Sequence, residues 1–291
     1  MPNHDPLQPW AILPSYAQHV LTLMEADEPQ QPAACEPVLF SEWGEPLAAN
    51  STTTGSMIAV LPLSGPVSPR GEYGGTSLDQ FTRVVQQLDN NPNVSAIVLD
   101  VSSPGGTVTG TLEAADAVRA VRDRGNTQIV SVANGMMASA ATWIGTAAEE
   151  VYVTKSGQAG SIGVIAMYAD ASEAYENMGV KISVMRTPEK KARFSGVEPL
   201  TDEMRQHMES LIGSSYQKFL RAMADNRKVR VDSVESRFGG GEMMDAGAAN
   251  EAGLVDRIGS LDDAIARVAK QKRKAPGAIR AEIDIAEFAA E

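Results

Sequence analysis

Ser139 is the residue whose surroundings best suit nucleophilic chemistry. It lies in the segment Asn134-Gly135-Met136-Met137-Ala138-Ser139-Ala140-Ala141, directly after an apolar run of strand length at 128–133. Small neighbours allow a substrate backbone to approach the hydroxyl, and a helix beginning there would favour developing negative charge. A serine buried in a small-residue helix-packing face is the commoner arrangement, so this segment alone does not establish a nucleophile.

Two glycine-rich turns offer backbone groups for the same chemistry. Ser103-Pro104-Gly105-Gly106 follows a buried apolar run at 96–101. A Pro-Gly-Gly corner before a helix leaves N–H groups free to bind an oxyanion or a phosphate. Ala159-Gly160-Ser161-Ile162-Gly163-Val164 is a second such turn, entering a predicted strand. Each is equally typical of an ordinary turn, because glycine relieves backbone strain there.

A lysine is a better candidate for the base than a histidine. None of the histidines lies at the end of a predicted strand, where the active-site groups of open α/β sheets gather; they are His4, His19 and His207. Lys190 and Lys191 lie in a polar loop at 186–193. A lysine base must be desolvated until it loses its charge, as in Ser-Lys hydrolases. A charge run is more often a solvated surface, so this loop alone decides nothing.

The elements that must position these residues alternate between strand and helix. The continuous apolar run 96–101 is typical of a strand buried on both faces. Alternation of this kind predicts βαβ units and a mainly parallel sheet. Further strands are predicted at 58–63, 128–133, 151–153, 162–167 and 180–185, and helices at 77–88, 112–124, 138–148, 171–178, 201–226 and 261–271.

Composition excludes several classes of function. The 291 residues carry a net charge of -12, which argues against a general nucleic-acid binder. One cysteine, Cys35, excludes an internal disulfide framework and a zinc site built on cysteine pairs. With three scattered histidines, a His-rich metal site is not expected. We see no signal peptide and no apolar window long enough to cross a membrane, so we expect a soluble, intracellular protein without a membrane anchor.

Three segments are expected along the chain. Residues 1–55 are rich in Pro, Gln, Ser and Thr, with a helical pattern only at 17–24, and are interpreted as an N-terminal arm or pro-segment. Residues 56–271 would form the main domain, and residues 272–291 a flexible tail.

Taken together, these segments resemble the signal peptide peptidase A family, and specifically its phage branch of capsid-maturation (prohead) proteases. The resemblance runs from about Met57 to Val268 and rests on the order and separation of four motifs, each only moderately specific. They are Leu99-Asp100-Val101-Ser102-Ser103-Pro104-Gly105-Gly106-Thr107-Val108, Ala133 to Ala140, Gly160-Ser161-Ile162-Gly163-Val164 and Gly253-Leu254-Val255-Asp256. Pro9 to Ala17 is more weakly similar to the phage branch.

The resemblance implies a role for each candidate residue. Ser139 would be the nucleophile and Lys191 the general base, with Lys190 as the adjacent competitor. Lys191 is preferred because it lies ten residues before Thr201, the spacing to the helix start in relatives. Ser161 resembles the residue that orients the lysine. The oxyanion hole would be the backbone N–H groups of Gly106 and Ala140.

This sequence departs from the family pattern at two places. The Gly-Gly pair that usually follows the nucleophile is Ala140-Ala141, and alanine has narrower allowed backbone angles than glycine. The usual Lys-Asp pair is replaced at Lys191 by Ala192-Arg193. Activity is expected despite both changes.

The fold implied by the resemblance is a ClpP/crotonase-like α/β spiral of βαβ units with a helical C-terminal part that packs on neighbouring subunits in a ring. The implied function is a serine endopeptidase, without metal or cofactor, that cleaves phage scaffold, portal or capsid proteins in the prohead within the bacterial host cytoplasm. A further prediction is that the enzyme trims its own arm or tail.

Three alternatives stay open. They are a housekeeping peptidase that degrades signal peptides, a crotonase-fold acyl-CoA enzyme, and a structural prohead component that has lost catalysis. The crotonase fold also uses backbone N–H groups in its oxyanion hole, so the fold alone does not decide between the peptidase and the acyl-CoA enzyme.

Overall fold

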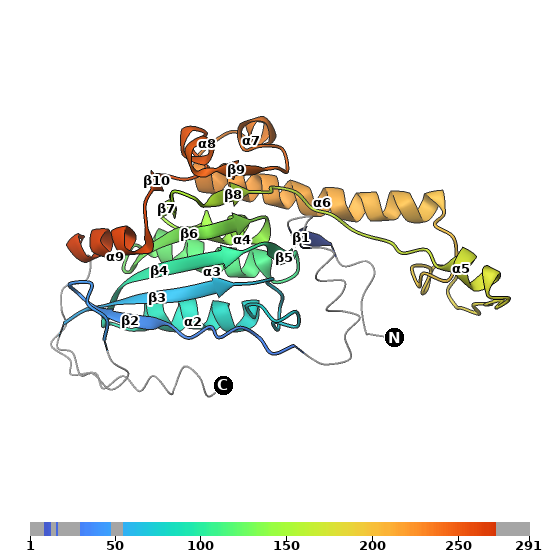
Figure 1. The fold of residues 1–291 in the computed structure, drawn as a ribbon, viewed down its shortest axis with the longest axis horizontal. Coiled ribbons are helices and arrows are strands. Elements are labelled where there is room, and N and C mark those ends of the chain that lie inside the picture. The colour runs from blue at the N-terminus through green and yellow to red at the C-terminus, as the bar shows by residue number, and fades with distance from the viewer. Residues whose placement is uncertain (1–8, 13–15, 17–29, 48–54, 272–291) are drawn as a thin grey trace.

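A mixed sheet forms the centre of the molecule (Figure 1). The computed structural model describes residues 9–12, 16, 30–47 and 55–271. The main path of the sheet has the order β10 (Arg257–Ile258), β7 (Glu150–Val153), β6 (Gln128–Ala138), β4 (Val94–Ser103), β3 (Met57–Ser64) and β2 (Val38–Ser41). From β10 to β3 all neighbours are parallel, and only β2 runs antiparallel to its neighbour. The predicted parallel sheet is therefore confirmed.

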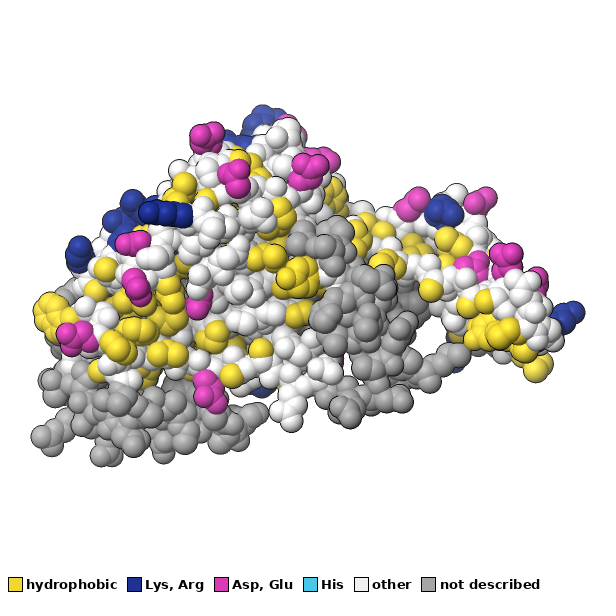
Figure 2. Space-filling model, viewed as in Figure 1, with side chains coloured by type: hydrophobic (Ala, Val, Ile, Leu, Met, Phe, Trp, Pro, Cys, Tyr) yellow, Lys and Arg dark blue, Asp and Glu magenta, His cyan; other side chains and the backbone are white. Residues whose placement is uncertain are grey.

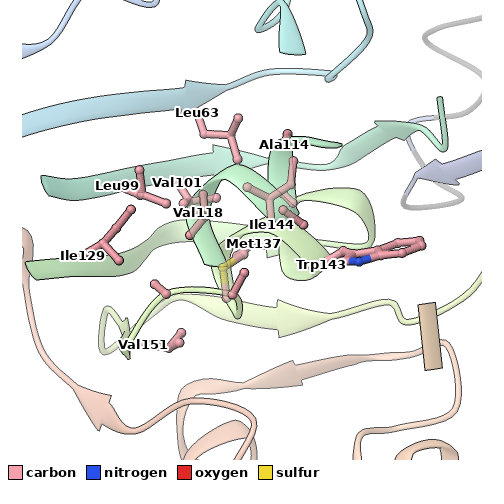
Figure 3. Packing of buried hydrophobic residues seen from close by; sticks show 14 of the residues in the cluster. Leu63, Leu99, Val101, Ala114, Val118, Ile129, Met137, Trp143, Ile144 and Val151 are labelled. Atoms are coloured by element: carbon pink, nitrogen blue, oxygen red, sulfur yellow. The ribbon is translucent and has the colours of Figure 1, made fainter. Parts of the chain in front are cut away.

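Helices cover the sheet on both faces, because successive residues of the central strands point to opposite sides. Ala59, Leu61, Ile97 and Leu99 face the larger core, which is closed by α2 (Leu78–Asn90), α3 (Thr111–Arg124) and α4 (Ala140–Gly145). The alternate residues Ile58, Val60, Ala96 and Val98 pack on the other face under α9 (Leu261–Lys270). This two-sided burial explains why residues 96–99 are all apolar, whereas Asp100, nearer the end of β4, is only half-buried. Figure 3 shows the packing of the larger core around Trp143, Met137 and Val118.

Polar caps fix where several helices begin. The side chain of Ser77 accepts the N–H of Gln80 at the start of α2. Ser260 and Asp263 form a reciprocal capping box at the start of α9. Thr201 caps the long helix α6 (Asp202–Arg227) by accepting the N–H of Met204, so the predicted helix from this residue is confirmed.

A second, smaller sheet layer continues from the carboxyl end of β6. β8 (Gln158–Gly160) pairs parallel with the last residues of β6 and antiparallel with β9 (Met243–Asp245). The short helices α7 (Val231–Arg237) and α8 (Ala246–Glu251) lie beside β9 (Figure 1). This helical C-terminal part packs on the core through α6, whose Phe219 and Met223 are fully buried.

Residues 166–200 leave the core and form an arm together with the N-terminal half of α6 (Figure 1). The arm contains α5 (Ser172–Asn177). The strand predicted at 180–185 is wrong, because these residues are irregular and most are exposed. The strand predicted at 162–167 is reduced to a single bridge at Ile165. Alternating apolar residues form a strand only where another strand edge pairs with them, and no strand in the described part of the chain pairs with the arm.

Parts of the expected N-terminal arm belong to the folded body. β1 (Trp10–Ile12) pairs antiparallel with β5 (Gly105–Thr107), and β2 joins the edge of the main sheet. The helix predicted at 17–24 and the tail 272–291 lie outside the described residues. Within the described ranges, no helix is long and apolar enough to cross a membrane.

Candidate active site

Ser139 stands at the junction between β6 and α4 with a strained backbone. Its φ is 54° and its ψ -114°, a region that L-residues rarely adopt. Its N–H donates to the Gly160 carbonyl (2.8 Å), and its carbonyl accepts the N–H of Trp143 (3.0 Å). Strain of this kind persists only where the surroundings enforce it, and such residues cluster at active sites. The sharp turn lifts the serine side chain out of the strand register.

The turn at Gly105 and Gly106 lies in close contact with Ser139. A Cβ built on Gly105 would lie 2.9 Å from the Ala138 carbonyl oxygen and 3.0 Å from Ser139 Cβ, so only glycine fits. Ser103 fixes the turn by accepting the Gly105 N–H (3.1 Å) and donating to the Gly65 carbonyl (2.7 Å). Gly106 is equally crowded, because its Cβ would lie 1.8 Å from the Val67 carbonyl oxygen. The structure therefore brings the predicted oxyanion turn to Ser139.

Ala140, the other predicted oxyanion donor, is the first residue of α4 and is fully buried. Neither Ala140 nor Ala141 has a positive φ, so the alanine pair fits here without the backbone freedom of glycine. The first departure from the family pattern is therefore accommodated by the local backbone.

Ser161 lies in the segment that follows β8, and this segment also contacts Ser139. Its φ is 55°, and its N–H donates to the Glu242 carbonyl (2.8 Å). The hydroxyl of Ser139 donates to the Gly163 carbonyl (3.4 Å), so the two serine segments are in contact. Among the described residues four non-glycine residues have positive φ, and they include both predicted serines and Ala192, which follows Lys191. The unusual backbone angles thus gather in the segments that carry the predicted site.

Lys191 lies away from Ser139, in a loop of the arm. Its loop is tied to α6, because Lys190 and Arg193 both form ion pairs with Glu203 (2.5 and 3.2 Å). Phe219 of the same helix stacks on Trp143 of α4, with ring centroids 4.6 Å apart. The distance along α6 from Glu203 to Phe219 is about 24 Å, at roughly 1.5 Å per residue. Lys191 is exposed on this arm, and the single chain does not place its amine beside Ser139.

Arg193, part of the second departure from the family pattern, contacts other residues of the arm. Arg193 pairs with Glu203 and its guanidinium lies over the Phe194 ring, 5.2 Å from the centroid. Phe194 packs with Met204 and Met208 at the N-terminal half of α6. Arg193 and Phe194 therefore hold the lysine loop on the arm.

Among the described residues, the predicted nucleophile and the predicted oxyanion turn lie together, and the predicted lysine does not lie beside them. The Gly105-Gly106 turn is buried beside a strained serine, and backbone N–H groups in such a place suit a tetrahedral oxyanion. In the ranges that the structure describes, no three His, Cys, Asp or Glu side chains gather closely enough to hold a metal ion. Sequence reasoning missed the supporting backbone of Gly65 and Val67, since a backbone partner leaves no side-chain signal.

Comparison with known proteins is consistent with this geometry. Residues 122–275 match the Peptidase family S49 profile, and residues 70–156 match the Clp protease profile, in agreement with the α/β architecture. The chain is 30% identical over 76% of its length to Capsid assembly protease C of Escherichia phage lambda, covering 52% of that protein. It is 31% identical over 75% of its length to Protease 4 of Salmonella typhi, covering 35% of that protein.

A second phage protein is also similar. The Head-tail preconnector protein GP5 of Enterobacteria phage P21 is 28% identical over 73% of this chain, which covers 42% of that protein. The chain thus spans about half or less of the length of these curated relatives.

Proposed function

Because the chain belongs to peptidase family S49, we propose that it is a serine endopeptidase with Ser139 as nucleophile and Lys191 as general base. The observation that carries the proposal is the strained Ser139 set against the Gly105-Gly106 turn, where a Cβ on Gly105 would lie 3.0 Å from the Ser139 Cβ. Such a pair of features supplies an attacking hydroxyl and backbone donors for the oxyanion that the attack creates.

The proposed reaction proceeds in two halves. The Ser139 hydroxyl attacks the scissile carbonyl while the neutral lysine amine takes its proton, and the lysine then returns that proton to the leaving amine. The N–H groups of Gly106 and Ala140 stabilise the oxyanion. Water then hydrolyses the acyl-enzyme with the same lysine as base. Ser161 holds the lysine amine in position.

We assign the lysine to a second copy of the chain. Lys191 stands on an arm that extends from the body, about 24 Å along α6 from the helix segment next to Trp143. Hydrophobic side chains gather on this arm in Figure 2. Met178, Val180, Ile182 and Met185 are 66%, 47%, 40% and 95% exposed, which is unusual for a segment that stays in water. Docking of the arm on a neighbour would cover them and bury the lysine, as a base requires.

Copies that dock head to tail form a closed ring when the rotations between successive copies add up to a full turn. The oligomer that we propose is therefore a ring with active sites formed between neighbours. Its substrates are proteins, which reach the site as extended segments.

We further propose that the substrates are phage scaffold, portal or capsid proteins in the prohead. The support is the similarity to two phage proteins whose names refer to capsid assembly and to the head-tail preconnector. A housekeeping role is the second candidate, since the similarity to Protease 4 of Salmonella typhi is as strong. Co-expression with the capsid and scaffold proteins, followed by mass spectrometry of the cleaved chains, distinguishes the two.

The decisive experiment for the activity uses casein and a fluorogenic peptide as substrates. Ser139→Ala is expected to lower hydrolysis by about 1000-fold or more. A phosphonofluoridate should label the wild-type protein at Ser139 alone. Cleavage that survives in Ser139→Ala would overturn the assignment, and an affinity for coenzyme A without any cleavage would favour the acyl-CoA alternative. Absence of both cleavage and labelling would favour an inactive structural component.

A further inference from the structure

The strand β1 lies between the two segments that flank Ser139. On one edge Trp10, Ala11 and Ile12 pair antiparallel with Thr107, Gly106 and Gly105. On the other edge Trp10 and Ile165 exchange both backbone hydrogen bonds, at 2.9 and 2.8 Å. The carbonyl of Pro9 also accepts the N–H of Val108 (3.1 Å). A segment from the start of the chain is therefore held as a middle strand between two edges.

Both edges belong to the candidate site. Gly106 carries a proposed oxyanion donor, and Ile165 follows Ser161 and Gly163, whose carbonyl accepts the Ser139 hydroxyl. A Cβ on Gly105 would lie 2.3 Å from the Ala11 carbonyl oxygen and 3.0 Å from Ser139 Cβ. The Ala11 carbonyl and the nucleophile thus flank the same glycine. With β1 in place, Ser139 has no exposed surface.

β1 forms no part of the main sheet. Within the described residues it pairs with β5 in a separate two-stranded sheet, plus the bridge to Ile165. An extended peptide that adds itself to exposed strand edges is a general mode of peptide recognition, in which backbone bonds give affinity and alternate side chains give selectivity. The position of β1 is what an extended substrate segment would need in order to reach Ser139.

The side chains of β1 alternate between two environments. Ala11 points into the main core and is fully buried. Trp10 and Ile12 point the other way and form a small apolar cluster with Tyr73 and Ile165. The Trp10 and Tyr73 rings lie 5.1 Å apart at 54°. The inner position thus holds a small, fully buried side chain, whereas the outer positions hold large apolar ones.

Building on the proposed peptidase function, we propose that residues 9–12 occupy the peptide-binding cleft as an internal substrate mimic that must leave, or be cut, before a substrate enters. The cleft binds extended peptides with a small side chain between two bulky apolar ones. Tyr73 and Ile165 are the residues that select the bulky side chains. The chain therefore limits its own activity through its N-terminal segment.

The test measures binding and does not require hydrolysis. A fluorescent peptide with the sequence Gln-Pro-Trp-Ala-Ile-Leu, that of residues 8–13, is titrated into full-length Ser139→Ala protein. The same titration is made with Ser139→Ala protein that also carries Trp10→Ser and Ile12→Ser. The apparent affinity of the peptide is proportional to the fraction of molecules whose cleft is open. The peptide should therefore bind the protein with Trp10→Ser and Ile12→Ser at least about tenfold more tightly than the parent Ser139→Ala protein.

Two controls make this comparison specific. Ser139→Ala with Trp43→Ser removes a tryptophan that is 70% exposed, near β2, and should bind like the parent. A peptide with Trp in place of the Ala should bind neither protein, because the inner position is fully buried. If Trp10→Ser with Ile12→Ser does not fold, Ala11→Asp replaces it, since a carboxylate at that buried position forces the strand out.

Equal peptide affinity for the parent and the strand variant would overturn the proposal, because the cleft would then not be occupied. Absence of binding to either protein would also overturn it, since the segment would then have no affinity for the cleft. Neither result touches the proposed peptidase activity, which is tested by cleavage and labelling of the wild-type protein and of the Trp10→Ser, Ile12→Ser variant with Ser139 intact. Substrate cleavage by the Trp10→Ser, Ile12→Ser variant with Ser139 intact should exceed that of the wild type.

Discussion

Phe219 of α6 stacks on Trp143 of α4, with ring centroids 4.6 Å apart and an interplanar angle of 12°. Trp143 lies in the helix that begins after Ser139, so this contact holds the C-terminal half of α6 close to Ser139. The other end of α6 holds the loop that carries Lys191. Within one chain α6 therefore separates Ser139 from the loop of Lys191, which is why we assign the proposed base to a neighbouring copy.

The two neighbouring lysines should differ sharply in their effect on activity. Lys191→Ala should lower kcat by at least about 100-fold, because general base catalysis contributes that much or more. Lys190→Ala is the matched control, since Lys190 is an exposed partner of Glu203, and it should retain most of the activity. Steady-state kinetics on the fluorogenic peptide measure both. The reverse ranking would make Lys190 the base.

The turn at Gly105 should tolerate no side chain. Gly105 has φ +91°, and an alanine methyl there would collide with the carbonyl oxygens of Ala11 and Ala138. Gly105→Ala should therefore displace the oxyanion turn and abolish most of the activity. Gly125→Ala is the control, because Gly125 also has positive φ (+67°) but open space around it.

Comparison with Gly125→Ala separates the cost of an alanine at positive φ from the effect of the collision at position 105. Gly125→Ala should cost about 1 kcal/mol of the free energy of unfolding, the cost of a left-handed alanine, with activity unchanged. Urea denaturation and kinetics on both variants provide the comparison. If Gly105→Ala were as active as Gly125→Ala, the turn could not be the oxyanion hole.

Ser161 is predicted to act as a positioning residue. Ser161→Ala should lower kcat by about tenfold, a part of the contribution that acid–base catalysis makes, while KM and the melting temperature stay close to the wild-type values. Alanine meets the same backbone cost at φ 55° as serine, so the fold should tolerate the change. A rise in KM with unchanged kcat would instead indicate that Ser161 binds substrate.

Glu150 should make stability depend on pH. Burial raises the pKa of its carboxyl, but the hydrogen bonds and charges of Arg257 and Arg267 outweigh that effect, and the pKa lies below its ordinary value of 4.5. As the pH falls, the unfolded chain binds the proton first. The stabilisation is therefore present above pH 4.5 and is lost as the pH falls through the lower pKa of the folded state.

The test of this linkage is Glu150→Gln. At pH 7 it should lower the free energy of unfolding by about 1 kcal/mol, since both arginines are partly exposed. The difference from the wild type should shrink in acid, near pH 3, as measured by urea denaturation. A difference between Glu150→Gln and the wild type that stayed the same at pH 7 and pH 3 would contradict this linkage.

The central fold could be predicted from the sequence because burial leaves a direct pattern. The run 96–99 is apolar at every position because both faces of β4 are covered there, and this pattern can be read from the sequence without knowing which elements pack on the strand. Ser139 and the Gly105-Gly106 turn could also be predicted, because the alternation of strands and helices places both at the ends of strands.

The arm and β1 could not be predicted in the same way. The apolar residues at 180–185 predict a strand, but none of the strands that the structure describes pairs with them. β1 has only three residues, too few to show a period, and its partners lie about 95 residues away in the sequence. In both cases the structure depends on a distant or external partner, which local patterns do not contain.

Mixing two inactive variants tests the shared active site most directly. Ser139→Ala and Lys191→Ala proteins are each expected to be inactive. After subunit exchange at equal amounts, about a quarter of the sites in a ring would combine an intact serine with an intact lysine from the neighbour, so about a quarter of the wild-type activity should return. No recovery in assemblies that native mass spectrometry shows to contain both variants would contradict the account.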